Sequence, residues 1–447
     1  MNVEFKNNFC TLVGCGSEEF DNLFKMPPFR GIRVNTLKAD LKTVQKCFDF
    51  NLTQTPFFKN EYYIPSGYSG IGNLPLHHAG AFYVQEPSAS SVLSVLDVKP
   101  GDKVLDLCAA PGGKSTGIAE ALKGNGILWS NEFIKKRAVA LLSNIERMGI
   151  PNAVVSSMDT EYLCKALVGF FDCVLVDAPC SGEGMWRHNP LVEQEWSIKN
   201  IDLCVNRQRQ ILNSAAKAVR AGGRLVYSTC TFNVRENEEN VLWFLGEHKE
   251  FVLKNIRVEF GRKGLLGRSD IDDAVRRVLP QDGGEGHFIA VFEKDSNNIG
   301  NTEYDTFSEN ISPNNKIAVE SFLKSNFSVL PEGILIEKNN MVSLVPNGLP
   351  KIKGDILRCG ILLGEIRKGR LEPAHSLFAA IGTKPLRKLD LSINDPLIYS
   401  FLRGAEIPAE VSDPGYIAIM VEGCPLGFGK RSANRITNKY PKGLRLK

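Results

Sequence analysis

Short apolar stretches alternate with stretches of helical periodicity between residues 103 and 294. The apolar stretches include "KVLDLCAA", "GILWSNE", "AVVSSM", "FDCVLVDAPC" and "GRLVYSTC". Strands that are apolar throughout are typical of a parallel sheet buried on both faces, and the helices between them indicate right-handed crossover connections. We therefore expect an α/β fold with a Rossmann-like, doubly wound sheet, in which "HFIAVFEK" (287–294) is the last strand.

The segments around this pattern divide the chain further. We expect a small α+β domain over 1–70, because "GIRVNTLKADLKTVQKCFDF" indicates a strand followed by a helix. The doubly wound domain follows over 71–295. Residues 296–315 are rich in Asn, Ser and Asp, which predicts a linker. Residues 316–385 are expected to form a small mixed domain, and 386–447 a domain rich in short strands such as "GYIAIMVEG".

Composition argues against several classes of protein. The segment "MNVEFKNNFC" has no apolar core behind a basic flank, so no signal peptide is predicted. No apolar run approaches the roughly 20 residues that a membrane-spanning helix needs. The eleven cysteines are scattered and form no CxxC pair, so neither a disulfide framework nor a metal site is predicted. We expect a monomeric cytoplasmic protein with reduced thiols.

Basic residues gather near the end of the chain. Residues 351–447 contain 17 Lys and Arg against nine Asp and Glu, and the last eighteen residues, "KRSANRITNKYPKGLRLK", contain seven basic residues and no acid. Such a run is either a solubilising tail or a surface that binds anions. Because Asn, Tyr and Pro interrupt it, a folded surface that contacts RNA is the interpretation we favour.

The stretch "LDLCAAPGGKSTGIAEAL" (105–122) resembles a phosphate-binding loop at first sight. A phosphate-binding loop needs a glycine five positions before its Gly-Lys pair, and that position is Cys108. The dinucleotide pattern GxGxxG is also absent. What remains is a small-residue turn between a strand and a helix. Such a turn lets backbone amides approach a nucleoside that lacks a pyrophosphate, and S-adenosylmethionine fits this description.

Four acidic residues lie at or just after the ends of consecutive predicted strands: Asp106, Glu132, Asp159 and Asp177. An acid at the end of the second strand of a doubly wound sheet typically accepts hydrogen bonds from ribose hydroxyls. Each acid taken alone has a simpler interpretation as the cap of the helix that follows. Four in register favour a nucleoside site instead.

Two cysteines follow strands at the same predicted edge of the sheet, Cys180 in "DAPCSGEGMWR" and Cys230 in "YSTCTFNVRENEEN". Cysteine in this position suggests thiol chemistry on a pyrimidine. A thiolate that adds to C6 makes C5 nucleophilic enough to accept a methyl group, and protonation of N3 by Asp177 would assist the addition. Chemistry alone does not decide which thiol attacks. Core packing is the simpler role for Cys164, Cys173 and Cys204, which lie within helix or strand patterns.

These stretches resemble the Sun (NOL/NOP/Sun) family of RNA cytosine-5 methyltransferases. The resemblance rests on "CAAPGGK", "DAPCSG", "STCT", "FYVQEPSAS" and "GGEGHF", and covers about residues 30–294. It implies that Cys230 is the nucleophile and that Cys180 helps release the product, with Asp177 as a third catalytic residue. It also implies S-adenosylmethionine as the cofactor. The implied cofactor-binding residues are Cys108, Ala109, Ala110, Pro111, Gly112, Gly113, Lys114, Glu132, Asp159 and Asp177.

The C-terminal third is similar to the bacterial subgroup of this family that modifies small-subunit ribosomal RNA. The similarity rests on "GFGKRSANRITNKYPKGLR" and implies a PUA-like RNA-binding domain over 386–447. We therefore expect a methyltransferase that forms 5-methylcytosine in 16S ribosomal RNA, with the RNA or the small ribosomal subunit as its partner. The alternatives are a tRNA methyltransferase with the same chemistry, a nucleotide hydrolase, and a non-catalytic RNA-binding factor.

A target cytosine must leave its helix, so a pocket for the extruded base is expected. Trp186, Arg187 and His188 follow the first cysteine and are candidates to line it, with simple packing as the alternative for Trp186. Arg33, in "RVNTL", is expected to contact either RNA or an acidic neighbour. Lys114 is expected to orient the cofactor or the acids rather than to bind phosphate.

Overall fold

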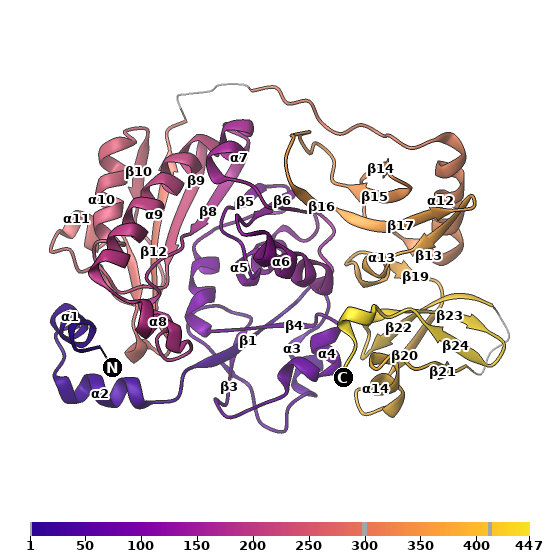
Figure 1. The fold of residues 1–447 in the computed structure, drawn as a ribbon, viewed down its shortest axis with the longest axis horizontal. Coiled ribbons are helices and arrows are strands. Elements are labelled where there is room, and N and C mark those ends of the chain that lie inside the picture. The colour runs from indigo at the N-terminus through magenta and orange to yellow at the C-terminus, as the bar shows by residue number, and fades with distance from the viewer. Residues whose placement is uncertain (1, 297–301, 410–413) are drawn as a thin grey trace.

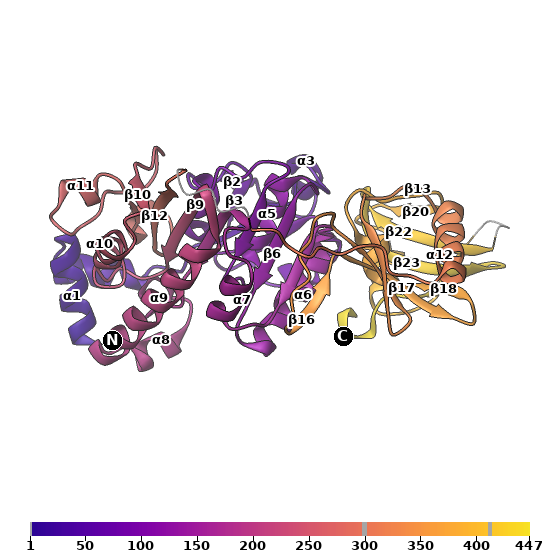
Figure 2. The same cartoon turned by 90° about the horizontal axis from the view of Figure 1, so that it is seen from above.

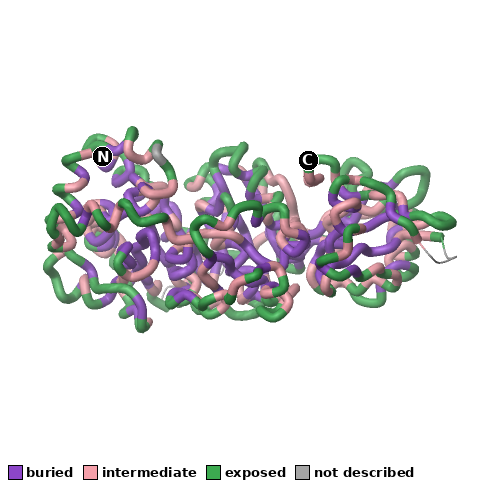
Figure 3. The backbone as a smooth tube through the Cα atoms, turned by 90° about the horizontal axis from the view of Figure 1, so that it is seen from below, coloured by how far each residue is buried: buried purple, intermediate pink, exposed green. Residues whose placement is uncertain are grey.

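The computed structural model describes residues 2–296, 302–409 and 414–447. The chain forms an elongated body in which the C-terminal third lies beside the central sheet, at the right of Figures 1 and 2. Helices α1 (Val3–Val13) and α2 (Ser17–Lys25) lie at the opposite end. Buried backbone runs through the interior along the whole length (Figure 3).

The central sheet has the doubly wound topology that the sequence predicts. Its strand order is β10-β12-β9-β8-β5-β6-β7-β16, with β11 paired to β12. The five strands β5 to β9 are parallel, whereas β12 is antiparallel to β9 and β16 to β7. The strand bounds are β5 Lys103–Asp106, β6 Ile127–Asn131, β7 Ala153–Ser156, β8 Phe171–Asp177, β9 Val219–Thr229, β10 Phe251–Lys254, β11 Arg276–Val278, β12 His287–Lys294 and β16 Ile356–Cys359.

Helices cover both faces of this sheet. Along β5, Leu105 packs into the core beneath α7 and α9, whereas Val104 packs into the core beneath α5 and α6. Both residues are fully buried, which explains why the strands are apolar throughout. Cys164, Cys173 and Cys204 are buried as expected. The helix bounds are α5 Gly113–Leu122, α6 Lys135–Met148, α7 Thr160–Ala166, α8 Pro190–Glu195, α9 Ile198–Ala218, α10 Glu238–Glu247 and α11 Ser269–Asp272.

The N-terminal region contributes a separate four-stranded antiparallel sheet with the order β2-β3-β1-β4. Strand β4 lies beyond residue 70, where the sequence suggested a boundary, but it pairs with β1. Helices α1 and α2 do not pack on this sheet, because Phe5 and Phe20 pack with Trp186 beside α8. The bounds are β1 Arg30–Val34, α3 Leu41–Gln45, β2 Thr53–Gln54, β3 Glu61–Ile64, α4 Pro75–His78 and β4 Phe82–Gln85.

The C-terminal third holds two larger sheets, β14-β15-β17-β18 and β20-β22-β23-β24-β21, and the short pair β13-β19. The first group has the bounds α12 Pro313–Asn326, β13 Phe327–Val329, β14 Ile334–Lys338, β15 Met341–Val345, β17 Ile361–Arg367, β18 Arg370–Pro373, α13 His375–Ala379 and β19 Lys384–Pro385. The second has β20 Lys388–Leu391, α14 Pro396–Leu402, β21 Ile407–Pro408, β22 Gly415–Val421, β23 Cys424–Ser432 and β24 Arg435–Asn438.

Strand β16 belongs by sequence to the expected 316–385 domain but forms the edge of the central sheet. Ile356 pairs with Ser156, and Cys359 pairs with Val154. Arg358 Nη1 lies 2.7 Å from Glu146 Oε1 on α6, which adds an ion pair to the strand pairing. The C-terminal third is therefore joined to the central sheet by backbone hydrogen bonds, and the open edge of that sheet is covered.

Histidines gather where the N-terminal region, α6 and the last sheet meet. His78 Nδ1 lies 2.9 Å from the Tyr440 hydroxyl, and the His375 ring packs edge-on against the same tyrosine. Burial lowers the pKa of both His78 and His375 to about 4, helped by the positive charge of Arg147 at His78 and of Lys38 at His375. Both imidazoles are therefore neutral in the folded protein at neutral pH.

Acid should loosen this junction. Because the folded-state pKa of His375 lies below its ordinary value of 6.5, the unfolded chain binds the proton first. The contribution of neutral His375 to the free energy of unfolding is complete above pH 6.5 and is lost as the pH falls toward 4. At pH 5 the loss is about 2 kcal/mol for one such histidine. We expect His375→Phe to lose less stability than the wild type between pH 7 and pH 5 in denaturant unfolding. Equal pH dependence in the two proteins would contradict this account.

Candidate active site

The two motif cysteines meet at the carboxyl edge of the central sheet. Strands β8 and β9 are parallel neighbours, and Asp177 pairs with Ser228 in their register. Each cysteine lies just beyond its strand, and the Cys180 and Cys230 Sγ atoms are 3.4 Å apart. The sequence predicted that both thiols face one cleft, and the geometry brings them into direct contact.

The contact between the sulfurs distinguishes the two thiols. The pKa of Cys180 is raised well above its ordinary value, first by the hydrogen bond with Cys230 and then by burial. Cys180 therefore keeps its proton and can donate it toward Cys230 Sγ. The ammonium of Lys114 lies near enough to Cys230 for the two groups to interact electrostatically.

Asp177 is held as a carboxylate at the base of the cleft. Lys114 Nζ lies 2.7 Å from its Oδ2, and the Ser228 hydroxyl donates to its Oδ1 over 2.8 Å. Although burial alone would raise the pKa of Asp177, the charge of Lys114, the neighbouring His287 and the hydrogen bonds from Lys114 and Ser228 together lower it. His287 Nε2 lies 3.8 Å from Oδ1, and burial lowers the pKa of this histidine to about 3. The cleft thus contains one firm ion pair beside a neutral imidazole.

The loop Cys108–Gly113 connects β5 to α5, and two of its carbonyl groups accept hydrogen bonds from α6. Arg137 Nη2 and Asn144 Nδ2, both on α6, donate to the Ala110 and Pro111 carbonyls at 2.9 Å. Gly112 has φ of +113°, a conformation that favours glycine. With its carbonyls occupied, the loop can offer the amides at the start of α5 to a ligand.

The acids predicted from the sequence line the same edge of the sheet. Asp106 ends β5, and its buried Oδ1 has no hydrogen-bond partner, while the Ser115 hydroxyl donates to Oδ2 over 2.6 Å. Glu132 follows β6, is buried, and accepts from the Ile134 amide over 3.0 Å. An orphaned carboxylate oxygen beside a glycine loop fits a ligand with an ammonium group, and Glu132 has acceptor capacity left for ribose hydroxyls. The residues present therefore fit S-adenosylmethionine.

Asp159 lies after β7 at this edge but is exposed. Its Oδ1 accepts from the Tyr162 amide over 3.0 Å and caps α7. The helix-cap interpretation therefore describes the contact that the structure records, and a cofactor contact would have to use the remaining acceptor sites of the carboxylate.

Trp186 and Arg187 do not line a base pocket. Trp186 is buried and stacks on Phe5 with ring centroids 4.0 Å apart. Arg187 forms a two-pronged ion pair with the buried Glu285, with both distances 2.8 Å. His188 is partly exposed, and its Nε2 lies 3.2 Å from the Phe29 carbonyl. These side chains attach the N-terminal helices and the segment after them to the catalytic sheet, which sequence spacing could not reveal.

Arg33 contacts an acidic neighbour and not solvent. It is fully buried, lies 3.7 Å from Glu120, and donates to the Gly113 carbonyl over 2.7 Å. Because Gly113 begins α5, this arginine of the N-terminal sheet reaches directly behind the cofactor loop. The alternative of an RNA contact is incompatible with its burial.

Several residues of the site were not singled out from the sequence. Ser228 and Ser115 hold Asp177 and Asp106, and His287 lies beside the Lys114–Asp177 pair. Ser228 and His287 were already inside the quoted motifs "STCT" and "GGEGHF". A rule that treats every polar residue of a motif as a candidate would have found both.

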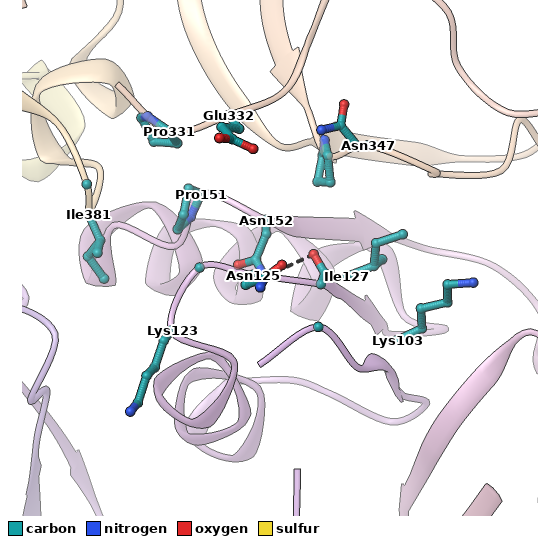
Figure 4. Close-up of a pocket in the computed structure, with 15 residues that line it drawn as sticks. Lys103, Lys123, Asn125, Ile127, Pro151, Asn152, Pro331, Glu332, Asn347 and Ile381 are labelled. Carbon is teal, nitrogen blue, oxygen red and sulfur yellow. Dashed lines mark hydrogen bonds between the residues drawn. The ribbon is translucent and has the colours of Figure 1, made fainter. Parts of the chain in front are cut away.

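One sizeable cavity lies elsewhere in the described part of the chain. It has a volume of about 570 Å³ and is lined by the starts of β5 and β6 and by C-terminal loops, as Figure 4 shows for Asn125, Asn152, Glu332 and Asn347. The amino ends of the strands form this cavity, whereas the cysteines and acids lie at the carboxyl ends. It is therefore not the site of the chemistry.

Two other kinds of site are absent from the described ranges. No helix in residues 2–296, 302–409 and 414–447 is long and apolar enough to cross a membrane. Within the same residues, no group of three or more His, Cys, Asp or Glu is arranged to hold a metal ion.

Comparison with known proteins matches four family models along the chain. Residues 93–293 match the model of 16S rRNA methyltransferase RsmB/F, and residues 1–87 the N-terminal domain of 16S rRNA methyltransferase RsmF. Residues 321–381 match the first C-terminal domain of the RsmF rRNA methyltransferase, and residues 388–446 its PUA domain.

Whole-chain relatives and solved structures agree with these matches. The chain is 32% identical to the ribosomal RNA small subunit methyltransferase F of Salmonella heidelberg, over 96% of this chain and 92% of that protein. It is 31% identical to the Vibrio cholerae (strain M66-2) protein of the same name, over 94% and 91%.

Two solved structures from Pyrococcus horikoshii are similar. A methyltransferase homolog protein is 26% identical over 66% of this chain and 100% of that chain, with a TM-score of 0.55. NSun6, crystallised with SFG, covers 65% of this chain and 97% of that chain at 23% identity, with a TM-score of 0.58, and so shows the fold. The predicted fold class and family resemblance are confirmed: the chain belongs to the family of ribosomal RNA small subunit methyltransferase F.

Proposed function

We propose that this protein transfers a methyl group from S-adenosylmethionine to C5 of a cytosine in small-subunit (16S) ribosomal RNA. The observation that carries the proposal is the pair of thiols in contact beside a glycine loop and its acids. Bound S-adenosylmethionine supplies the methyl group. The residues proposed to hold it are the loop Cys108–Lys114 and the acids Glu132, Asp159 and Asp177.

Cys230 is proposed to form the bond to the substrate. Its sulfur adds to C6 of the extruded cytosine, the C5–C6 double bond opens toward C4, and N3 gains a proton. Overall, the proton of the thiol moves to N3. The carboxylate of Asp177, ionised beside Lys114, can accept this proton and pass it on. Asp177 was expected to protonate N3. Because it begins as a carboxylate, it must first accept the thiol proton that it then gives to N3.

Cys180 is proposed to act after methylation. The proton on C5 must leave, its electron pair forms the C5–C6 double bond, and the C6–S pair returns to Cys230. The pKa of Cys180 is raised chiefly by its hydrogen bond with Cys230, and that cause disappears while Cys230 is bonded to C6. Cys180 can then ionise and take the C5 proton, which is the order of events that the product release requires.

The basic end of the chain is proposed to bind RNA phosphates. Lys430, Arg435, Lys439 and Lys442 are exposed on or beside β23 and β24. Contacts of this kind add affinity that depends on salt and little on sequence. We propose that the protein acts as a monomer in the cytoplasm. A tRNA substrate would use the same chemistry, and the ribosomal RNA assignment is preferred because the relatives are named for it.

Bisulfite sequencing tests the substrate. RNA from cells that lack the protein should lose one or more 5-methylcytosine positions in 16S ribosomal RNA, and a plasmid copy should restore them. A copy with Cys230→Ala should not. Loss of methylation confined to tRNA would overturn the ribosomal assignment but leave the chemistry intact.

The two cysteines should give opposite results with RNA substrate. Cys180→Ala should accumulate a covalent RNA–protein adduct, seen as a slowly migrating band in a denaturing gel, because the step that releases Cys230 is blocked. Cys230→Ala should give neither adduct nor methylation. Cys204→Ala, a buried cysteine of α9, serves as the control and should retain activity. Full methylation by the Cys230 variant would refute the mechanism.

Calorimetry tests the cofactor assignment. The wild type should bind S-adenosylmethionine and not ATP. Glu132→Gln should weaken binding by about tenfold to a hundredfold, since a hydrogen bond to a charged acceptor contributes about 1.5–3 kcal/mol. Glu247→Gln, an exposed glutamate at the end of α10, should bind like the wild type. Binding of ATP alone would identify a nucleotide hydrolase instead.

A further inference from the structure

A hydrogen-bonded chain of four buried side chains lies directly behind the two cysteines. Ser181 follows Cys180, Thr231 follows Cys230, and their hydroxyl oxygens are 2.8 Å apart. At one end the Ser181 Oγ lies 2.5 Å from Glu236 Oε1, and at the other the Thr231 Oγ1 lies 2.9 Å from Glu183 Oε2. All four side chains are buried.

Counting hydrogens shows that the two hydroxyl groups supply one hydrogen fewer than this row of hydrogen bonds needs. The row carboxyl–hydroxyl–hydroxyl–carboxyl contains three oxygen–oxygen contacts, each of hydrogen-bond length. The two hydroxyl groups supply two hydrogens. If both carboxyls were ionised, each hydroxyl would donate to its own carboxylate, and the two hydroxyl oxygens would face each other without a hydrogen between them. One carboxyl must carry the third hydrogen.

We propose that Glu236 carries this proton, and that the protonated chain Glu236–Ser181–Thr231–Glu183 is the positioning device that holds the two catalytic thiols in contact. The proton on Glu236 is donated to Ser181, Ser181 donates to Thr231, and Thr231 donates to Glu183. This inference rests on the proposed function of the cysteines and adds residues that position them.

The surroundings of the two carboxyls decide which end is protonated. Glu183 accepts from the Trp196 indole N–H over 2.8 Å and from the Phe232 amide over 3.0 Å, and the positive charge of Arg277 opposes the rise in its pKa that burial causes. Glu236 accepts from the Ser181 amide over 3.0 Å and from Gln208 over 2.8 Å. Burial raises the pKa of Glu236 to about 7, with no cation among the causes.

The other titratable groups near Glu236 also favour its neutral form. Cys180, Cys204 on α9 and Tyr227 on β9 each interact with its charge, and none of them is cationic. Arg277 on β11 is engaged with Glu238 through a hydrogen bond of 2.5 Å from its Nε. A second negative charge beside Glu183 would therefore be buried without a counter-ion, which is costly.

The chain acts on the reaction through the turns that carry the sulfurs. Glu236 fixes both the amide and the hydroxyl of Ser181, and Glu183 fixes the Phe232 amide beyond Thr231. When Glu236 loses its proton, the link between the two hydroxyls is lost, and the turns are no longer held together. The alignment of Cys180 with Cys230 should therefore weaken as the pH rises past neutrality.

Infrared spectroscopy tests the proton directly, without any RNA. The wild-type spectrum at pH 6 should contain the carbonyl stretch of a protonated carboxylic acid that is missing from Glu236→Gln. Glu183→Gln is the matched control and should keep that band. Ser181→Ala should shift the band, because the acceptor of the proton is removed, and this variant also decides the matter if Glu236→Gln does not fold. Identical spectra for the wild type and Glu236→Gln would overturn the proposal, as would an unshifted band in Ser181→Ala.

Methylation rates test the positioning role. The side-chain amide introduced by Glu236→Gln can donate to Ser181 at any pH, so this variant should keep near wild-type kcat at pH 6. Relative to the variant, wild-type kcat should fall by about tenfold at pH 8, one unit above the pKa. A constant ratio across this range would overturn the positioning role. If neither the wild type nor Glu236→Gln methylates RNA, the proposed function fails, but the infrared result still decides where the proton lies.

Discussion

The parallel pairing of β8 with β9 is the constraint on which the rest of the site depends. A single register, in which Asp177 lies beside Ser228, creates one side-chain contact at the strand ends and two just beyond them. These contacts join Ser228 to Asp177, Cys180 to Cys230, and Ser181 to Thr231. Because side chains alternate between the faces of a sheet, a slip of one residue would separate all three pairs at once. The chemistry is therefore set by backbone hydrogen bonds that lie beneath it.

The cofactor loop depends on parts of the chain that are distant in sequence. The carbonyl of Gly113 accepts from Arg33 of the N-terminal sheet, and the carbonyl of Ala110 accepts from Arg137 of α6. Arg33 is fully buried, and its partner Glu120 lies on α5, the helix into which the loop leads. The N-terminal sheet is thus part of the support of the loop, and this gives a physical reason for its packing against the catalytic sheet.

Much of the site could be predicted because its residues share one edge of a parallel sheet. Asp106, Glu132, Cys180 and Cys230 each follow an apolar run, and strand direction alone places them together. The sequence could not show that Trp186 stacks on Phe5, because the two are far apart along the chain. Strand β16 was hidden for a similar reason: its partner is β7, about 200 residues earlier. Short edge strands have weak patterns, and their pairing is decided by packing.

The balance of buried charge explains why neighbouring acids behave differently. Asp177 is ionised because Lys114 lies 2.7 Å away, so it can accept a proton when Cys230 reacts. Burial raises the pKa of Glu236 to about 7, and no cation offsets it, which makes this carboxyl a donor in the chain behind the thiols. The fold thus separates a carboxylate that handles protons in the cleft from a carboxyl that holds the cleft together. The chief difference is one cation: Lys114 is the first of the groups that lower the pKa of Asp177, whereas no cation opposes the effect of burial on Glu236.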